Sequence, residues 1–114
     1  MADRPNPLKL NPLQCRTLAI LQQLARTEGH AMAPAEDGSV TVGGFPPLHG
    51  NHYHVGDAVV MAADATGLHN PAVFTALGRK GLARQDMPGS AVLTPEGLAY
   101  DTGLSQKVLH RADH

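Results

Sequence analysis

Apolar residues recur at helical spacing in the N-terminal part of the chain, between Asn11 and Gly29. Steps of three and four residues gather them on one face of a helix. Asn11 is a suitable N-cap, Pro12 a suitable first helical residue, and Gly29 a suitable C-terminal stop. The pattern predicts a helix with a buried face and a solvent face. The buried face carries Leu13, Thr17, Ile20, Leu21 and Leu24, and the solvent face carries Gln14, Arg16, Gln22, Gln23 and Arg26.

The next segment, His30 to Gly44, has the pattern of a hairpin. "EDGS" lies at its centre, and Asp37-Gly38 supplies the turn residues that a short hairpin prefers. Pro34 marks the first strand as an edge strand, because proline cannot donate to a ladder. After a loop rich in glycine and proline, the alternation in "HYHV", His52 to Val55, predicts one more short strand.

Two further helices are predicted between Asp57 and Gly81. Asp57 is a candidate cap for "AVVMAADAT", which ends at Gly67. Asn70 and Pro71 are the expected N-cap and first residue of the following helix. That helix turns Val73, Phe74 and Leu77 inward and ends at Gly81.

The C-terminal part predicts a hairpin followed by a last helix. The hairpin spans residues 82–94, with Pro88-Gly89-Ser90 at its tip. Thr94 is the expected cap of the last helix, which we expect to run from Glu96 to Leu109 and to be weakened by two glycines. Residues 1–10 and 110–114 are expected to be flexible tails.

This order of elements, together with "GRKGLAR" and "LTPEGLA", resembles the winged helix-turn-helix regulators of bacteria, of the MarR and PadR type. Gly67-Leu68 stands where those regulators carry a Gly-Leu or Gly-Val pair between their second and third helices. The resemblance implies an α+β, mainly α fold in one domain, residues 11–109. It places the helix-turn-helix at 57–81 and a β-hairpin wing at 82–94, with an inserted hairpin and loop at 29–51 between the first helix and the first strand.

Composition narrows the class of protein. The chain has 114 residues, nine basic and ten acidic side chains, and a net charge of −1, so a basic surface must come from local clustering. Its single cysteine, Cys15, fits a reducing compartment, and no apolar run approaches the length of a membrane span. We therefore expect a cytoplasmic protein that does not enter membranes. No nucleophile elbow, catalytic triad spacing or phosphate loop is present in the sequence, and we expect no enzyme activity.

The candidate DNA contacts follow from the resemblance and from the outward positions of the predicted third helix and wing. Asn pairs well with adenine and Arg with guanine, and cations bind phosphates. Arg79 and Lys80 also suit the helix dipole at a C-terminus, which is a purely structural alternative. The predicted DNA contacts are His69, Asn70, Thr75, Arg79, Lys80, Arg84 and Gln85.

A second candidate site is a histidine cluster. His52 and His54 occupy alternate positions of a predicted strand and so share one face. Imidazole is a good ligand for zinc and nickel, and His49 and His30 are the further candidate ligands. The alternative is that these histidines are polar residues on the solvent side of a short strand.

The function hypothesis is a DNA-binding transcriptional regulator that binds double-stranded DNA as a homodimer, as the resemblance implies. Its dimer surface would be the helices Leu13 to Arg26 and Glu96 to Leu109. One alternative is a protein-interaction module on the same scaffold, suggested by the near-neutral charge and the apolar "GGFPPL" segment. The other is a metal-responsive regulator that uses the histidine cluster and needs zinc or nickel; otherwise no cofactor is expected.

Overall fold

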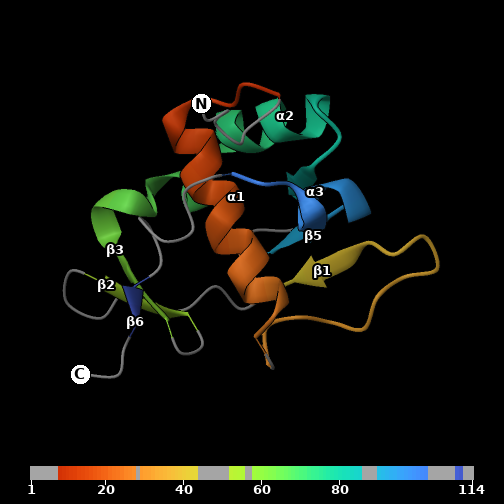
Figure 1. Ribbon diagram of the computed structural model, residues 1–114, viewed down its shortest axis with the longest axis horizontal. Helices are drawn as coiled ribbons and strands as arrows, with labels where there is room; N and C mark the ends of the chain where they lie inside the picture. Colours follow the sequence, from red (N-terminus) through yellow and green to blue (C-terminus); the bar gives the residue numbers. More distant parts are fainter. Residues whose placement is uncertain are drawn as a thin grey trace, which may run out of the picture.

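The computed structural model describes residues 8–27, 29–43, 52–55, 58–85, 90–102 and 110–111 of the chain. Within them it is a small α+β protein with three α-helices and two three-stranded antiparallel sheets (Figure 1). The helices are α1 (Pro12–Ala25), α2 (Pro71–Arg79) and α3 (Pro95–Ala99), and two 3-10 turns, η1 (Ala62–Asp64) and η2 (Thr66–His69), precede α2. The strands are β1 (Val40–Val42), β2 (His52–Val55), β3 (Ala58–Met61), β4 (Ala83–Gln85), β5 (Ala91–Leu93) and β6 (His110–Arg111).

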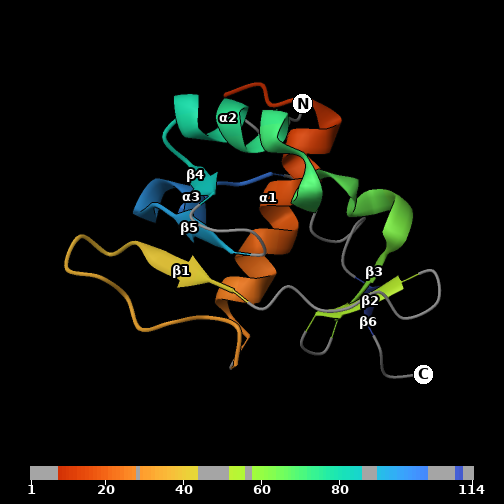
Figure 2. The ribbon, with the colours of Figure 1, turned by 180° about the vertical axis from the view of Figure 1, so that it is seen from behind.

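Helix α1 runs through the middle of the molecule, with one sheet on either side of it (Figures 1 and 2). The predicted N-cap is confirmed, and it forms a capping box: Asn11 accepts a hydrogen bond from the Gln14 N–H, and the Gln14 side chain accepts one from the Asn11 N–H. The helix is confirmed, but its burial is wider than one face. Its buried residues are Cys15, Thr17, Leu18, Ala19, Ile20, Leu21, Gln22 and Leu24.

The first sheet has the strand order β1-β5-β4. Strands β4 and β5 are the arms of the predicted 82–94 hairpin, paired from Ala83↔Leu93 to Gln85↔Ala91. The predicted 30–44 hairpin forms only in part. Its turn is present, with Gly38 at φ 88°, but its first arm contributes a single bridge, Ala31↔Val42. Strand β1 pairs on its other side with β5, so the second arm of that hairpin extends the β4–β5 sheet rather than forming a separate insertion.

The second sheet, of order β2-β3-β6, corrects two predictions. Residues Ala58–Met61, expected to be helical, form a strand paired with β2, and only short 3-10 turns follow. Two adjacent valines favour an extended chain, and the β2 edge satisfies the backbone there. The expected C-terminal tail is wrong at His110–Arg111, which pair with β3. The cap assigned to Asp57 lies outside the described residues.

Helix α2 begins and is oriented as predicted. The Asn70 side chain caps it by accepting from the Ala72 N–H at 3.0 Å, and Val73, Phe74 and Leu77 are buried. The turn η2 before it lies against α1, where a Cβ on Gly67 would overlap the Thr17 side chain. A residue with a side chain would push η2 away from α1, so glycine is needed at this position.

The last helix is shorter than predicted. Thr94 caps α3 by accepting from the Gly97 N–H, but α3 ends at Ala99 and Tyr100 is extended. The predicted continuation to Leu109 is therefore wrong up to Thr102, and residues 103–109 lie outside the described residues. Gly97 packs its backbone on the Leu82 carbonyl, where a Cβ would collide with main-chain atoms. This close approach is why a helix-weakening residue stands inside a short helix.

The core is aliphatic, as the scarcity of aromatic residues suggests. Its fully buried members come from α1, η2, α2, the β4–β5 hairpin and strands β1 and β3, and include Leu18, Ile20, Leu21, Leu24, Val42, Val60, Leu68, Leu77, Leu82 and Leu93. The N-terminal segment joins it before the expected start at Asn11. Leu10 is buried, and the Leu8 N–H donates to the Tyr100 hydroxyl at 2.8 Å. Across the described ranges, no helix has the length and apolarity to cross a membrane.

Two helical glycines offer a matched test of this packing. We expect Gly97→Ala to destabilise the protein by about 3 kcal/mol or more, because the new Cβ meets the rigid backbone at Leu82. Gly78→Ala in α2 meets only the Ala83 carbonyl at 3.5 Å, an ordinary contact, and should stabilise by about 0.5–1 kcal/mol. Urea denaturation midpoints of the two variants measure both effects. Equal midpoints would contradict the close packing at Gly97.

Candidate nucleic-acid interface

Helix α2 presents one exposed face to solvent. Val73, Phe74 and Leu77 anchor its other face in the core. The exposed face begins with the apolar residues Pro71 and Ala72, and polar and charged side chains follow only from the second turn onward. Its exposed residues are Pro71, Ala72, Thr75, Gly78, Arg79 and, at the C-cap, Lys80.

Strand β4 lies directly beside this helix and adds Arg84 and Gln85, both exposed. Together the two elements form a shallow hollow of about 330 Å³. Three of the predicted DNA contacts, Thr75, Arg84 and Gln85, line it, along with Pro71, Phe74 and Gly78. The structure therefore brings residues from α2 and from the β4–β5 hairpin onto one surface, which we call the α2–β4 surface.

Two of the predicted contacts already have structural roles. The Asn70 side-chain oxygen caps α2, and the Thr75 hydroxyl donates to the Pro71 carbonyl at 3.1 Å. Thr75 keeps its acceptor lone pairs toward solvent, but Asn70 is committed to the cap. His69 lies in η2, and its side chain is outside the described part of the structure. The cations Arg79, Lys80 and Arg84 remain the main chemical feature of the surface.

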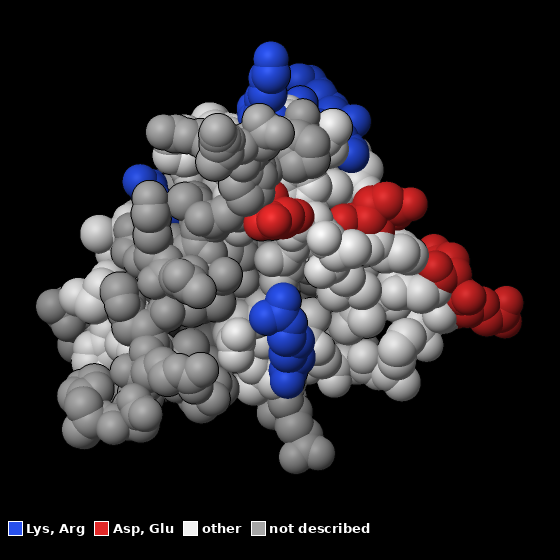
Figure 3. All heavy atoms as spheres, viewed as in Figure 1, with Lys and Arg blue, Asp and Glu red and all other residues white. Residues whose placement is uncertain are grey.

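Charge is distributed unevenly over the molecule. Figure 3 shows a group of Lys and Arg side chains at the end where α2 lies and further ones at the side and lower centre of the same face, with Asp and Glu side chains below the first group. The carboxylate of Asp37 interacts electrostatically with Arg84 of the α2–β4 surface. Hydrogen bonding to Ser39 lowers the pKa of Asp37, and attraction to Arg84 lowers it further. The carboxylate at the β1 turn therefore remains charged at neutral pH and partly offsets the positive charge of Arg84.

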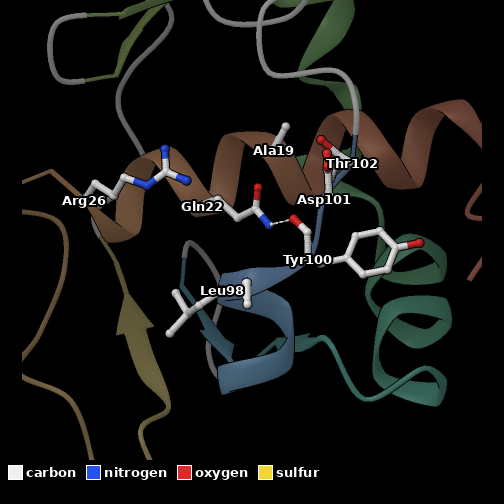
Figure 4. Close-up of a pocket in the computed structure, with 8 residues that line it drawn as sticks. Ala19, Gln22, Arg26, Leu98, Tyr100, Asp101 and Thr102 are labelled. Carbon is white, nitrogen blue, oxygen red and sulfur yellow. Dashed lines mark hydrogen bonds between the residues drawn. The ribbon is translucent and has the colours of Figure 1, made fainter. Parts of the chain in front are cut away.

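A second hollow, of about 310 Å³, lies between α1 and the segment that follows α3. Gln22 projects from α1 into this region (Figure 4), and its amide donates to the carbonyls of Gly97 at 2.8 Å and Tyr100 at 2.7 Å. The Tyr100 ring points away from Gln22. Arg26 and Asp101 also line the hollow, but the buried amide is committed to the backbone and serves to hold the two elements together.

The assignment of Gln22 to the solvent face of α1 is therefore wrong: the side chain is 6% exposed. A buried amide is stable only when it is hydrogen-bonded, and its partners are contributed by residues 75 and 78 positions away. The predicted dimer surface on α1 is also mostly buried within the chain, so little of it could contact a second copy. Between Leu13 and Arg26, only Arg26 is exposed.

The predicted metal ligands are not brought together among the side chains that the structure describes. A ring nitrogen of His30 lies 3.2 Å from the Gly43 carbonyl, with which it can hydrogen-bond. His49 lies outside the described residues, and so does the side chain of His54. No group of three or more His, Cys, Asp or Glu side chains suited to a metal occurs among the described residues. "GGFPPL", which suggested a protein partner, lies almost wholly in the residues that are not described.

Cys15 belongs to the core, as expected for a lone cysteine on an apolar helix face. It is 3% exposed, its thiol lies 3.8 Å from the Leu10 carbonyl, and burial raises its pKa. A thiol with a raised pKa and little exposure is a poor nucleophile, since the thiolate is the reactive form.

Comparisons of the chain with protein-family models, with curated proteins and with solved structures give no match. The function has to be inferred from the residues of the chain itself.

Removing the Gln22 amide tests the contact between α1 and α3. We expect Gln22→Ala to destabilise the protein by about 1–3 kcal/mol, because it leaves two carbonyls without their donor. Gln23→Ala is the matched control on the half-buried neighbouring position and should cost about 0.5 kcal/mol or less. Thermal or urea unfolding measures both variants. A Gln22→Ala protein as stable as the control would show that these hydrogen bonds contribute nothing net.

Proposed function

We propose that the chain binds double-stranded DNA through the α2–β4 surface and acts as a transcriptional regulator of winged-helix type. The observation that carries the proposal is that Arg84 and Gln85 of β4 line one hollow with Thr75 of α2, while Arg79 and Lys80 are exposed at the end of the same helix. A helix and an adjacent hairpin can contact neighbouring phosphates of a duplex at the same time.

The arrangement of the first sheet supports this proposal. In the resembled regulators a short strand precedes the helix pair, and here β1 precedes α2 in the chain and pairs with β5 of the hairpin. The hairpin is thus held by a third strand and by α2, so that its exposed side chains are presented from a fixed base. A rigid base reduces the entropy that is lost when a loop is ordered on binding.

The surface favours phosphate contacts over base reading. The first turn of α2, which in a recognition helix faces the base edges, exposes Pro71 and Ala72. Asn70, the side chain best suited to adenine, is committed to the helix cap. The remaining contacts are cations in the last turn of α2 and on β4. We therefore propose binding with a strong salt dependence and modest sequence discrimination.

The proposed docking also differs from a two-helix motif. Within residues 58–70 the chain forms a strand and two 3-10 turns, not a second α-helix. These turns pack on α1 and support α2 from behind, while the duplex would meet α2 and the hairpin alone. A small contact area on each copy favours binding as a homodimer on two half-sites, with a dimer surface away from the buried helix α1.

The test is binding of a mixed-sequence DNA duplex, followed by fluorescence anisotropy at several salt concentrations. We expect Arg79→Ala/Lys80→Ala to weaken binding and to flatten the slope of log K against log salt by about two, because two phosphate contacts are lost. Arg84→Ala should flatten the slope by about one.

The matched control is Arg26→Ala, which removes the same charge at the opposite end of α1 (Figure 1). It should leave the slope unchanged, so that an effect of net charge alone is separated from an effect of position. The wild-type protein failing to bind the duplex at low salt would overturn the proposal. So would an equal loss in the Arg26 and Arg84 variants.

A further inference from the structure

The hollow between α1 and the segment after α3 is a candidate site separate from the α2–β4 surface. One of its walls is a stripe of α1 and its C-cap: Ala19, Gln22 and Arg26 are three and four residues apart, and residues at that spacing lie on one face of a helix. The other wall is the chain from Leu98 to Thr102. The Gln22 amide donates to two backbone carbonyls, one in α3 and one directly after it. These hydrogen bonds fix the two walls relative to each other, so the hollow is a defined part of the fold.

Two opposite charges border this hollow without neutralising each other. Arg26 and Asp101 both line it, and both are exposed. Within the described part of the chain, no hydrogen bond or ion pair holds the Arg26 guanidinium, and none joins it to Asp101. In Figure 4 the two residues lie on opposite sides of Gln22, and the guanidinium points along α1 toward Gln22. A cation and a carboxylate therefore share one hollow with space between them.

The placement of these charges suits a ligand that carries both charges itself. Arg26 is four residues beyond Gln22, so its backbone lies about 6 Å further along the helix axis. Asp101 directly follows Tyr100, whose carbonyl oxygen is 2.7 Å from the Gln22 amide nitrogen. A hydrogen bond at either end of a ligand spans about 2.9 Å. A ligand that bridges Arg26 and Asp101 therefore needs only a short separation between its own charged groups.

We propose that this hollow binds a free α-amino acid with a small side chain. The Arg26 guanidinium would bind the ligand's carboxylate, for which its planar set of donors is well suited. The Asp101 carboxylate would accept from the ligand's ammonium group. A carboxylate has several lone-pair sites, so Asp101 can do this in addition to its interactions within the chain. The volume of about 310 Å³ is at the lower end for small-molecule sites, which favours a small side chain on the ligand.

The site should distinguish amino acids from molecules that carry a single charge. A simple carboxylate can engage only Arg26, and a simple amine only Asp101. Hydrogen bonds between two charged groups are stronger than those between neutral groups, so the loss of one should lower the affinity at least about tenfold. Gln22 adds no selectivity, because its amide is already bonded to the backbone.

The experiment is an NMR titration of the full chain, labelled with nitrogen-15, with L-alanine and, separately, with sodium acetate and ethylamine. We expect L-alanine to cause saturable shifts of the backbone amides in residues 19–26 and 98–102, which form the two walls. Acetate and ethylamine should bind at least about tenfold more weakly, since each lacks one of the two charges. No DNA is present, so the outcome is independent of the proposed function.

Four variants test the two charged residues. Arg26→Gln and Asp101→Asn should each weaken L-alanine binding at least about tenfold. Arg79→Gln and Glu96→Gln are the matched controls, because they make the same charge changes at exposed positions that do not line the hollow. Both should bind L-alanine as the wild type does.

The comparison of three ligands on the wild-type protein keeps the test decisive even if a variant folds poorly. The proposal is overturned if L-alanine causes no saturable shift, or if acetate or ethylamine binds as tightly as L-alanine. It is also overturned if Arg26→Gln or Asp101→Asn binds L-alanine as the wild type does, or if the control variants lose as much affinity as these two.

Discussion

The burial of α1 on almost every side is the constraint on which the rest of the structure depends. A helix that lies between two sheets must have apolar or hydrogen-bonded residues all around, not one apolar stripe. The chain meets this requirement with leucines and isoleucine on most sides, and with Thr17 and Gln22 where polar groups are enclosed. Thr17 donates to the Leu13 carbonyl within the helix, and Gln22 donates to the segment after α3. Strands β1, β2 and β5, both 3-10 turns, α2 and α3 all contact this helix.

Local signals were sufficient for the parts of the fold that local chemistry determines. The caps at Asn11, Asn70 and Thr94 place the starts of all three α-helices, because an N-cap is satisfied by the next turn of the same segment. The inward face of α2 and the β4–β5 hairpin also follow from local spacing. Of the candidate DNA contacts, the sequence could identify which side chains are cationic and outward, but not that Arg84 and Gln85 border the same hollow as Thr75.

The errors lie where distant segments decide the outcome. "AVVM" is a short apolar run that is compatible with a helix or a buried strand, and the pairing with β2 selects the strand. Gln22 has the composition of a solvent-facing residue, and only the carbonyls of Gly97 and Tyr100 make its burial favourable. His110 sits in a segment without periodicity, and its place beside Val59 depends on a sheet edge formed fifty residues earlier. Nothing in the local sequence carries that information.

One polypeptide connection leads from the second sheet to the α2–β4 surface, passing from β3 through η1 and η2 into α2. That connection is fixed midway, because Gly67 lies against Thr17 of α1 and Leu68 is 1% exposed. Coupling between sites requires an element with two alternative positions that both sites bias. A turn packed this closely against a buried helix has no room for a second position without opening the core. The position of the α2–β4 surface is therefore set by the packing of η2 and α2 on α1 and is independent of changes at the second sheet.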